Sequence, residues 1–146
     1  MYKILPPILW LIMGSVIILI DILTNLPIFP ETFKFFGVIF IVLGAAIFVI
    51  TGRKFRKVKT DIHTFHKPSH LMTDGLFAYT RNPIYLGFTI ALLGVVILAN
   101  NYLALLPWLA FFLLCNFWYI PFEEDMATIT FGPDYEKYKA GVRRWI

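Results

Sequence analysis

The chain has 146 residues, of which 59% are hydrophobic and only 15% are charged. A soluble domain of this length has too little interior to bury so much apolar side chain, so the excess is expected to face lipid. The single cysteine excludes an internal disulfide framework, and the net charge of +4 gives no reason to expect nucleic acid as a partner. The basic residues instead cluster where membrane topology places them.

Four apolar stretches are long enough, or nearly so, to cross a hydrocarbon core of about 30 Å. They comprise residues 4–23, 35–50, 84–99 and 102–122. The first stretch lacks a small-residue cleavage site, which favours a retained anchor over a signal peptide. The sequence therefore predicts an all-α integral membrane protein, with residues 1–146 forming a single domain of four transmembrane helices.

Lysine and arginine residues set the expected orientation. Seven lie between the second and third stretches and four follow the fourth, whereas the first loop has one and the third has none. We therefore expect both termini on the cytoplasmic side of the cell membrane, with residues 51–83 and 123–146 forming a polar cap. The basic residues at 52–57 are expected to bind lipid headgroups.

The dipeptide Asn100-Asn101 predicts a tight turn that makes the third and fourth helices antiparallel neighbours. Small residues in the second and third stretches recur at helical spacing and predict close approach to another helix. They are Gly37 and Gly44 in the second stretch, and Gly87, Ala91 and Gly94 in the third.

The start of the third helix has the composition of an anion site. Pro83 suits the first helical turn, and Asn82 is expected to cap the helix with its side chain. The helix start carries partial positive charge, and Arg81 adds a planar fork of donors that fits a carboxylate. Tyr85, one turn further on, offers a hydroxyl.

The end of the fourth helix is acidic. Glu123 and Glu124 are expected at a helix C-terminus, where the helix dipole disfavours anions. They therefore need a cation, which is either Arg81 in a structural ion pair or the positive group of a ligand. Asn116 is expected on the same helix face as Glu123. Nearby aromatic rings suit an adenine or a sulfonium, namely those of Trp118, Tyr119 and Phe122.

The last part of the chain predicts a short amphipathic helix. Gly132-Pro133 indicates a turn, and Asp134 is expected to cap a helix over residues 135–142. Its apolar stripe is expected either to lie in the membrane interface or to cover a site as a lid.

Two sequence blocks carry a family resemblance. Residues 73–87, TDGLFAYTRNPIYLG, resemble the Gly-aromatic…Arg-His-Pro-x-Tyr-x-Gly block of the isoprenylcysteine carboxyl methyltransferases and the related phospholipid N-methyltransferases. The second block comprises EEDM at 123–126, FGPDYEKY at 131–138 and VRRW at 142–145, and it is similar to the Glu-Glu…Phe-Gly-x-x-Tyr-x-x-Tyr tail of the same family. The resemblance covers about half of the chain, from residue 71 onward.

The resemblance implies S-adenosylmethionine as cofactor, bound at the cytoplasmic side, and a lipophilic methyl acceptor. The positions that it implies for cofactor binding are Gly75, Tyr79, Arg81, Asn82, Tyr85, Glu123 and Tyr138. The family has histidine where this chain has Asn82. Asparagine cannot titrate near neutral pH, so proton transfer at this position is not expected.

The residues and the resemblance predict the same chemistry. Arg81 suits the carboxylate of the cofactor, and Glu123 or Glu124 suits its ammonium. Methyl transfer needs position and desolvation more than covalent help. A prenylcysteine-like carboxylate acceptor needs no base, whereas a phospholipid amine or a thiol does. Arg81 and Glu124 are therefore the expected catalytic residues, with Glu124 as the base where one is needed.

Two other functions remain open. The chain could be a non-enzymatic four-helix membrane subunit with a structural Arg81–glutamate pair, or a membrane reductase, although it has no glycine-rich nucleotide loop. The three histidines, His63, His66 and His70, lie in one polar loop without a cysteine, so no metal is expected.

Overall fold

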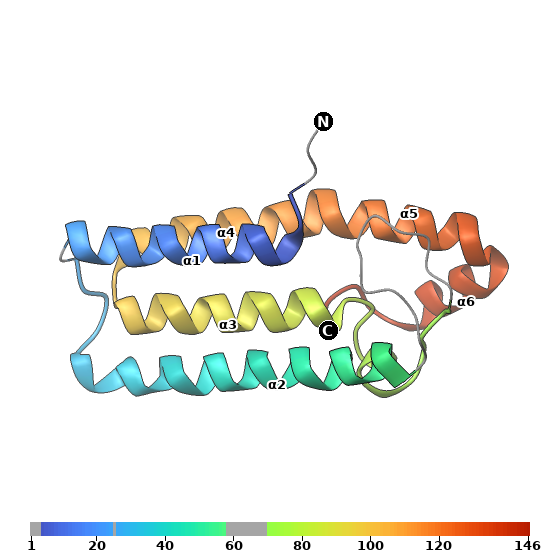
Figure 1. The fold of residues 1–146 in the computed structure, drawn as a ribbon, viewed down its shortest axis with the longest axis horizontal. Helices are drawn as coiled ribbons and strands as arrows, with labels where there is room; N and C mark the ends of the chain where they lie inside the picture. The colour runs from blue at the N-terminus through green and yellow to red at the C-terminus, as the bar shows by residue number, and fades with distance from the viewer. Residues whose placement is uncertain (1–3, 25, 58–69) are drawn as a thin grey trace.

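The structure is a computed structural model that describes residues 4–24, 26–57 and 70–146 (Figure 1). Within these ranges it is helical and contains no strand, which confirms the predicted all-α class. The long helices are α1 (Pro6–Leu23), α2 (Phe35–Lys57), α3 (Pro83–Ala99), α4 (Leu105–Leu114), α5 (Ile120–Phe131) and α6 (Pro133–Gly141). Short 3₁₀ turns are η1 (Glu31–Lys34), η2 (Gly75–Ala78) and η3 (Tyr102–Ala104). A π turn, η4 (Cys115–Tyr119), joins α4 to α5.

The helices are long and apolar enough for a membrane protein. Among the described residues, Pro6–Leu23, Glu31–Lys57 and Tyr102–Phe131 meet the length and hydropathy of a membrane span, and α3 is an apolar helix of 17 residues. α3 lies between α2 and the pair formed by α1 and α4 (Figure 1). It buries nine residues, whereas α2 buries three, so α3 is the central helix and α2 presents most of its surface to lipid.

Glycines bring α2 and α3 into backbone contact, as their spacing predicts. A Cβ atom added to Gly37 would lie 2.7 Å from the carbonyl oxygen of Gly94, and one on Gly87 would lie 2.9 Å from that of Gly44. Neither distance leaves room for a side chain. The two helices therefore pack at a spacing that only glycine permits at these positions.

The turn between α3 and η3 also forms as predicted, and its asparagine side chains form hydrogen bonds with the segment that follows α1. Asn100 adopts a left-handed conformation with φ of 50°. Its side-chain oxygen accepts hydrogen bonds from the backbone N–H groups of Ile28 and Phe29, each at 3.1 Å. Asn101 donates to the Thr24 carbonyl at 3.0 Å. Both asparagines are buried, so their polar groups need these partners.

Three expected boundaries are wrong. α2 continues through residue 50 to Lys57, and the fourth helix continues through residue 122 to Phe131. The helical stretch Tyr102–Phe131 has 30 residues, or about 45 Å, so it extends well beyond an apolar core of about 30 Å. Gly132, with φ of 55°, precedes α6, so Asp134 lies in the first turn and is not the N-cap.

Candidate functional site

A cavity of about 250 Å³ lies at the end of the bundle where α2 ends and α3 begins. α5 and α6 complete its walls, together with η2 and the first residues of α1. The polar and titratable lining residues are His70, Arg81, Asn82, Tyr85, Glu123, Glu124, Tyr135 and Tyr138. The cavity thus gathers residues from both predicted motif blocks.

The π turn decides which glutamate is buried. Buried positions in this helix include Pro107 and Phe111 before the turn, Cys115 and Tyr119 within it, and Ile120 and Glu124 after it. The steps of four residues continue to Tyr119 and then shift by one residue to Ile120, because a π turn accommodates an extra residue. An uninterrupted α-helix would continue from Cys115 in steps of four to Glu123. The shift of one residue brings Glu124 to the buried position instead.

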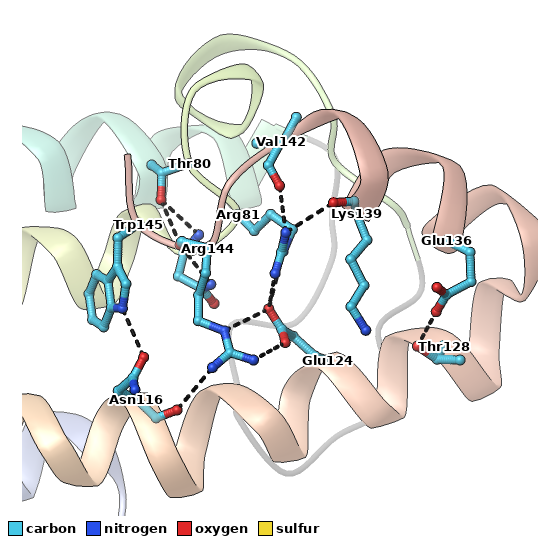
Figure 2. A network of polar contacts seen from close by, with 11 residues as sticks. Thr80, Arg81, Asn116, Glu124, Thr128, Glu136, Lys139, Val142, Arg144 and Trp145 are labelled. Carbon is cyan, nitrogen blue, oxygen red and sulfur yellow. Dashed lines mark hydrogen bonds and ion pairs between the residues drawn. The ribbon is translucent and has the colours of Figure 1, made fainter.

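Glu124 lies inside the helix and not at its C-terminus, so the predicted conflict with the helix dipole is wrong. Its carboxylate is held by two arginines (Figure 2). Arg81 Nη2 lies 2.8 Å from Oε1, and Arg144 Nη2 lies 2.6 Å from Oε2. The side chains of Glu124 and Arg81 are only 6% and 10% exposed. Two guanidinium groups and one carboxylate leave this cluster with one net positive charge, and of its three members Arg81 and Glu124 line the cavity.

Arg81 is also bound to the backbone of the segment around α6. Its Nη1 donates to the carbonyl oxygens of Lys139, at 3.1 Å, and Val142. Its own backbone N–H donates to the carbonyl of Arg143 at 3.0 Å. The structural ion pair between Arg81 and a glutamate, left open by the sequence, is therefore present, and it coexists with the net positive charge of the cluster.

Glu123 has a different environment from its neighbour. The Tyr85 hydroxyl donates a hydrogen bond of 2.7 Å to Glu123 Oε1, and both side chains line the cavity. Tyr85 comes from the first turn of α3, and its ring stacks on that of Tyr119. The two adjacent glutamates thus contribute to the cavity in two ways, one neutralised by arginines and one beside a phenol.

Asn82 occupies the N-cap position of α3, as predicted, but its side chain does not cap the helix. The Nδ2 group donates to the carbonyl of Arg144 at 3.0 Å, and the backbone N–H donates to Thr80 Oγ1 at 3.1 Å. The predicted capping hydrogen bond is therefore wrong. The amide is used to hold the segment that follows α6.

Two tyrosines of α6 close the cavity. Burial raises the pKa of Tyr138 to about 12, although the charge of Arg81 partly opposes this shift. Burial also raises the pKa of Tyr135. The Tyr138 hydroxyl donates to the carbonyl of Phe77 at 2.7 Å. Both phenols are therefore neutral at physiological pH, and Tyr138 acts as a donor, not as a base.

Some predicted residues lie elsewhere. Gly75, with φ of 64°, begins η2 and Tyr79 is 75% exposed, and neither lines the cavity. The three aromatic residues expected near an adenine or a sulfonium, Trp118, Tyr119 and Phe122, do not line it either. The aromatic residues that line it are Phe48, Phe55, Phe77, Tyr85, Phe88, Phe131, Tyr135 and Tyr138.

Arg144 was not predicted as a site residue, although it lies in the second motif block. The residues next to it in the sequence give no indication that it pairs with Glu124. His70 lines the cavity, whereas His63 and His66 lie outside the described residues. Within the described ranges, no three histidine, cysteine or acidic side chains are grouped as a metal site would need.

Comparisons with known proteins agree with the motifs. Residues 32–134 match the family described as phospholipid methyltransferase. The chain is 38% identical over 102 residues to a protein-S-isoprenylcysteine O-methyltransferase of Schizosaccharomyces pombe, and 29% identical over 132 residues to a probable protein-S-isoprenylcysteine O-methyltransferase of Oryza sativa.

These matches cover 68% and 82% of this chain, but only 42% of the yeast relative and 66% of the rice relative. An uncharacterized protein of Haemophilus influenzae is 36% identical over 63 residues, which span its whole length and 43% of this chain. No solved structure matches the chain.

Proposed function

This chain belongs to the phospholipid methyltransferase family, and we propose that it transfers a methyl group from S-adenosylmethionine to a lipophilic acceptor at the cytoplasmic face of the membrane. The observation that carries the proposal is the cavity itself. Arg81, whose partner Glu124 is also neutralised by Arg144, and the separate carboxylate of Glu123 line one cavity at the end of an apolar bundle.

The polar lining fits the amino-acid end of the cofactor. Its carboxylate suits the side of the cavity formed by Arg81 and the start of α3, where the helix dipole and the excess guanidinium charge both favour an anion. Its ammonium suits Glu123, whose carboxylate the Tyr85 hydroxyl orients. This assignment makes Glu123, not Glu124, the glutamate that contacts the cofactor.

The aromatic lining fits the rest of the cofactor. Phe77, Tyr135 and Tyr138 offer ring faces that attract a purine or a sulfonium. When bound, the sulfonium supplies an electrophilic methyl group for in-line displacement. The residues around it hold the donor in place and exclude water, which are the main requirements of this reaction.

The acceptor is proposed to reach the cavity from lipid. Phe48 and Phe88, from the middle of α2 and α3, line its apolar side. A volume of about 250 Å³ is at the lower end for a small-molecule site. A long lipid chain would therefore extend beyond the cavity into the bilayer.

The state of Glu124 favours a carboxylate acceptor. Both of its oxygens accept hydrogen bonds from arginines, which makes it a poor base for an amine or thiol. A carboxylate needs no proton removed. A prenylcysteine-like acid, the type of acceptor named for the yeast and rice relatives, therefore fits better than a phospholipid amine.

Calorimetric titration of the purified protein in detergent with S-adenosylhomocysteine tests cofactor binding. We expect one site, and Glu123→Gln is expected to raise the Kd about tenfold or more because it removes a charge-assisted contact. Asp125→Asn is the matched control, since it removes the same charge from the neighbouring exposed position outside the cavity. Equal affinity in wild type and Glu123→Gln would contradict the assignment of Glu123.

The competing function is a non-enzymatic membrane subunit, which the Arg81–Glu124 ion pair favours. In that case the wild type would bind no cofactor, and Arg81→Ala would lower only the melting temperature. The same titration therefore separates the two functions.

A further inference from the structure

Residues 142–146, here called the strap, cross from the start of α3 to the π turn in the fourth helix (Figure 2). Arg144 is the centre of this crossing. Its carbonyl accepts hydrogen bonds from Thr80 Oγ1, at 3.1 Å, and from Asn82 Nδ2, at 3.0 Å. Its backbone is thus fixed to α3, while its side chain reaches Glu124 on the opposite helix.

The π turn provides the anchor for the strap. The N–H of Ile120 donates to the carbonyl of Cys115, a step of five residues. The same step from Asn116 leads to Pro121, which has no N–H group. The carbonyl of Asn116 therefore lacks a helical donor in this register, and Arg144 Nη1 supplies one at 3.2 Å.

Trp145 strengthens the same anchor. Its Nε1 donates to Asn116 Oδ1 at 3.0 Å, and its ring packs on Phe112 with centroids 5.0 Å apart. The main chain and the side chain of Asn116 both therefore accept hydrogen bonds from the strap. Asn116, Arg144 and Trp145 all lie outside the cavity lining, so this docking acts on the cavity through the contact of Arg144 with Glu124.

We propose that Arg144, anchored on the π turn, is a positioning residue that fixes and neutralises Glu124, so that Arg81 presents its positive charge to a carboxylate ligand. The inference rests on the proposed function and adds a role for the strap. Arg81 and Glu124 alone would cancel. Arg144 binds Glu124 from outside the cavity lining, so the positive charge of Arg81 at the cavity is not cancelled. This charge is needed to bind the amino-acid end of the cofactor but not its nucleoside end.

Two ligands separate these ends. S-adenosylhomocysteine carries the carboxylate and ammonium, whereas 5′-methylthioadenosine has the nucleoside and sulfur without them. In calorimetric titrations, Arg144→Gln is expected to weaken S-adenosylhomocysteine binding about tenfold or more, because a charge-assisted interaction is lost. Binding of 5′-methylthioadenosine is expected to stay within about twofold of wild type.

Arg143→Gln is the matched control for charge. It makes the same substitution one residue away, at an exposed side chain that donates no hydrogen bond to a described residue. Affinity for both ligands is expected to be unchanged. Trp108→Phe is the control for stability, since it deletes a similar indole hydrogen bond, to the Thr89 carbonyl at 3.1 Å, away from the cavity.

Trp145→Phe keeps an aromatic ring but removes the hydrogen bond to Asn116, and it provides the test if Arg144→Gln does not fold. It is expected to weaken S-adenosylhomocysteine binding about two- to fivefold with 5′-methylthioadenosine unaffected. Equal weakening of both ligands by the strap variants, or none, would overturn the proposal. Wild-type protein that binds neither ligand would instead overturn the proposed function, and this inference with it.

Discussion

Adjacent residues of the same type have different environments at this site. Glu124 is buried between two arginines, whereas Glu123 accepts a hydrogen bond from a tyrosine and borders the cavity. Their difference arises from the one-residue shift at the π turn. The same chemical group is thus part of the scaffold at one position and a proposed ligand contact at the next.

Glu124→Gln is expected to lower the stability of the fold by about 3 kcal/mol, because it leaves two guanidinium groups near each other without their counter-ion. The melting temperature in detergent should fall clearly below that of the wild type. Asp125→Asn serves as the control and should change it little, since surface charges contribute little. Equal melting temperatures for Glu124→Gln and the wild type would contradict a structural role for the arginine cluster.

Helix α3 positions the site because its two neighbours hold it in different ways. Backbone contacts through glycines fix it against α2, and side-chain packing fixes it against α1 and α4. The start of α3 therefore holds Tyr85 in its first turn, and Arg81 and Asn82 just before it, at one end of the bundle with little conformational freedom.

Gly44→Ala is expected to destabilise the protein by about 1–3 kcal/mol, because the added methyl group meets the backbone of α3 at Gly87 and forces the helices apart. Gly52→Ala is the control in the same helix, where nothing lies within 4 Å of the new Cβ atom. It should be neutral or stabilising by up to about 1 kcal/mol. Thermal unfolding in detergent measures both, and similar melting temperatures would argue against the glycine contact.

The helices themselves could be predicted because hydropathy and small-residue spacing act locally. The π turn could not, because an apolar stretch has the same composition whether its register is α or π. Pro121 was the available signal, since it removes a donor from the helix. Taking its missing N–H into account would have placed Glu124, in place of Glu123, on the buried face of the helix.

At the scale of the whole molecule, the apolar bundle is closed at one end by charged and aromatic residues of the cap. The general position of this site was predictable, because both motif blocks flank the hairpin of α3 and α4. The closure by the strap was not, because contacts such as that between Arg81 and Val142 join residues far apart in sequence. No periodicity in the sequence records such pairs.

The orientation of the bundle is testable by cysteine labelling. In a Cys115→Ser background, Lys57→Cys places a thiol at the exposed end of α2 near the cavity, and Tyr102→Cys places one at the opposite end. The positive-inside rule predicts that a membrane-impermeant maleimide labels only the Tyr102→Cys variant in intact cells. Labelling of Lys57→Cys without permeabilisation would reverse the orientation and move the cavity to the outer face.

The most direct test of the proposed function is transfer of a labelled methyl group. Purified protein is incubated with methyl-labelled S-adenosylmethionine, a farnesylcysteine acid and phosphatidylethanolamine, and lipid products are analysed by mass spectrometry. We predict label in the farnesylcysteine methyl ester, with little in the phospholipid, and loss of this product in Glu123→Gln but not in Asp125→Asn. No labelled lipid from the wild type, together with no cofactor binding, would contradict the proposal that this membrane protein is a methyltransferase.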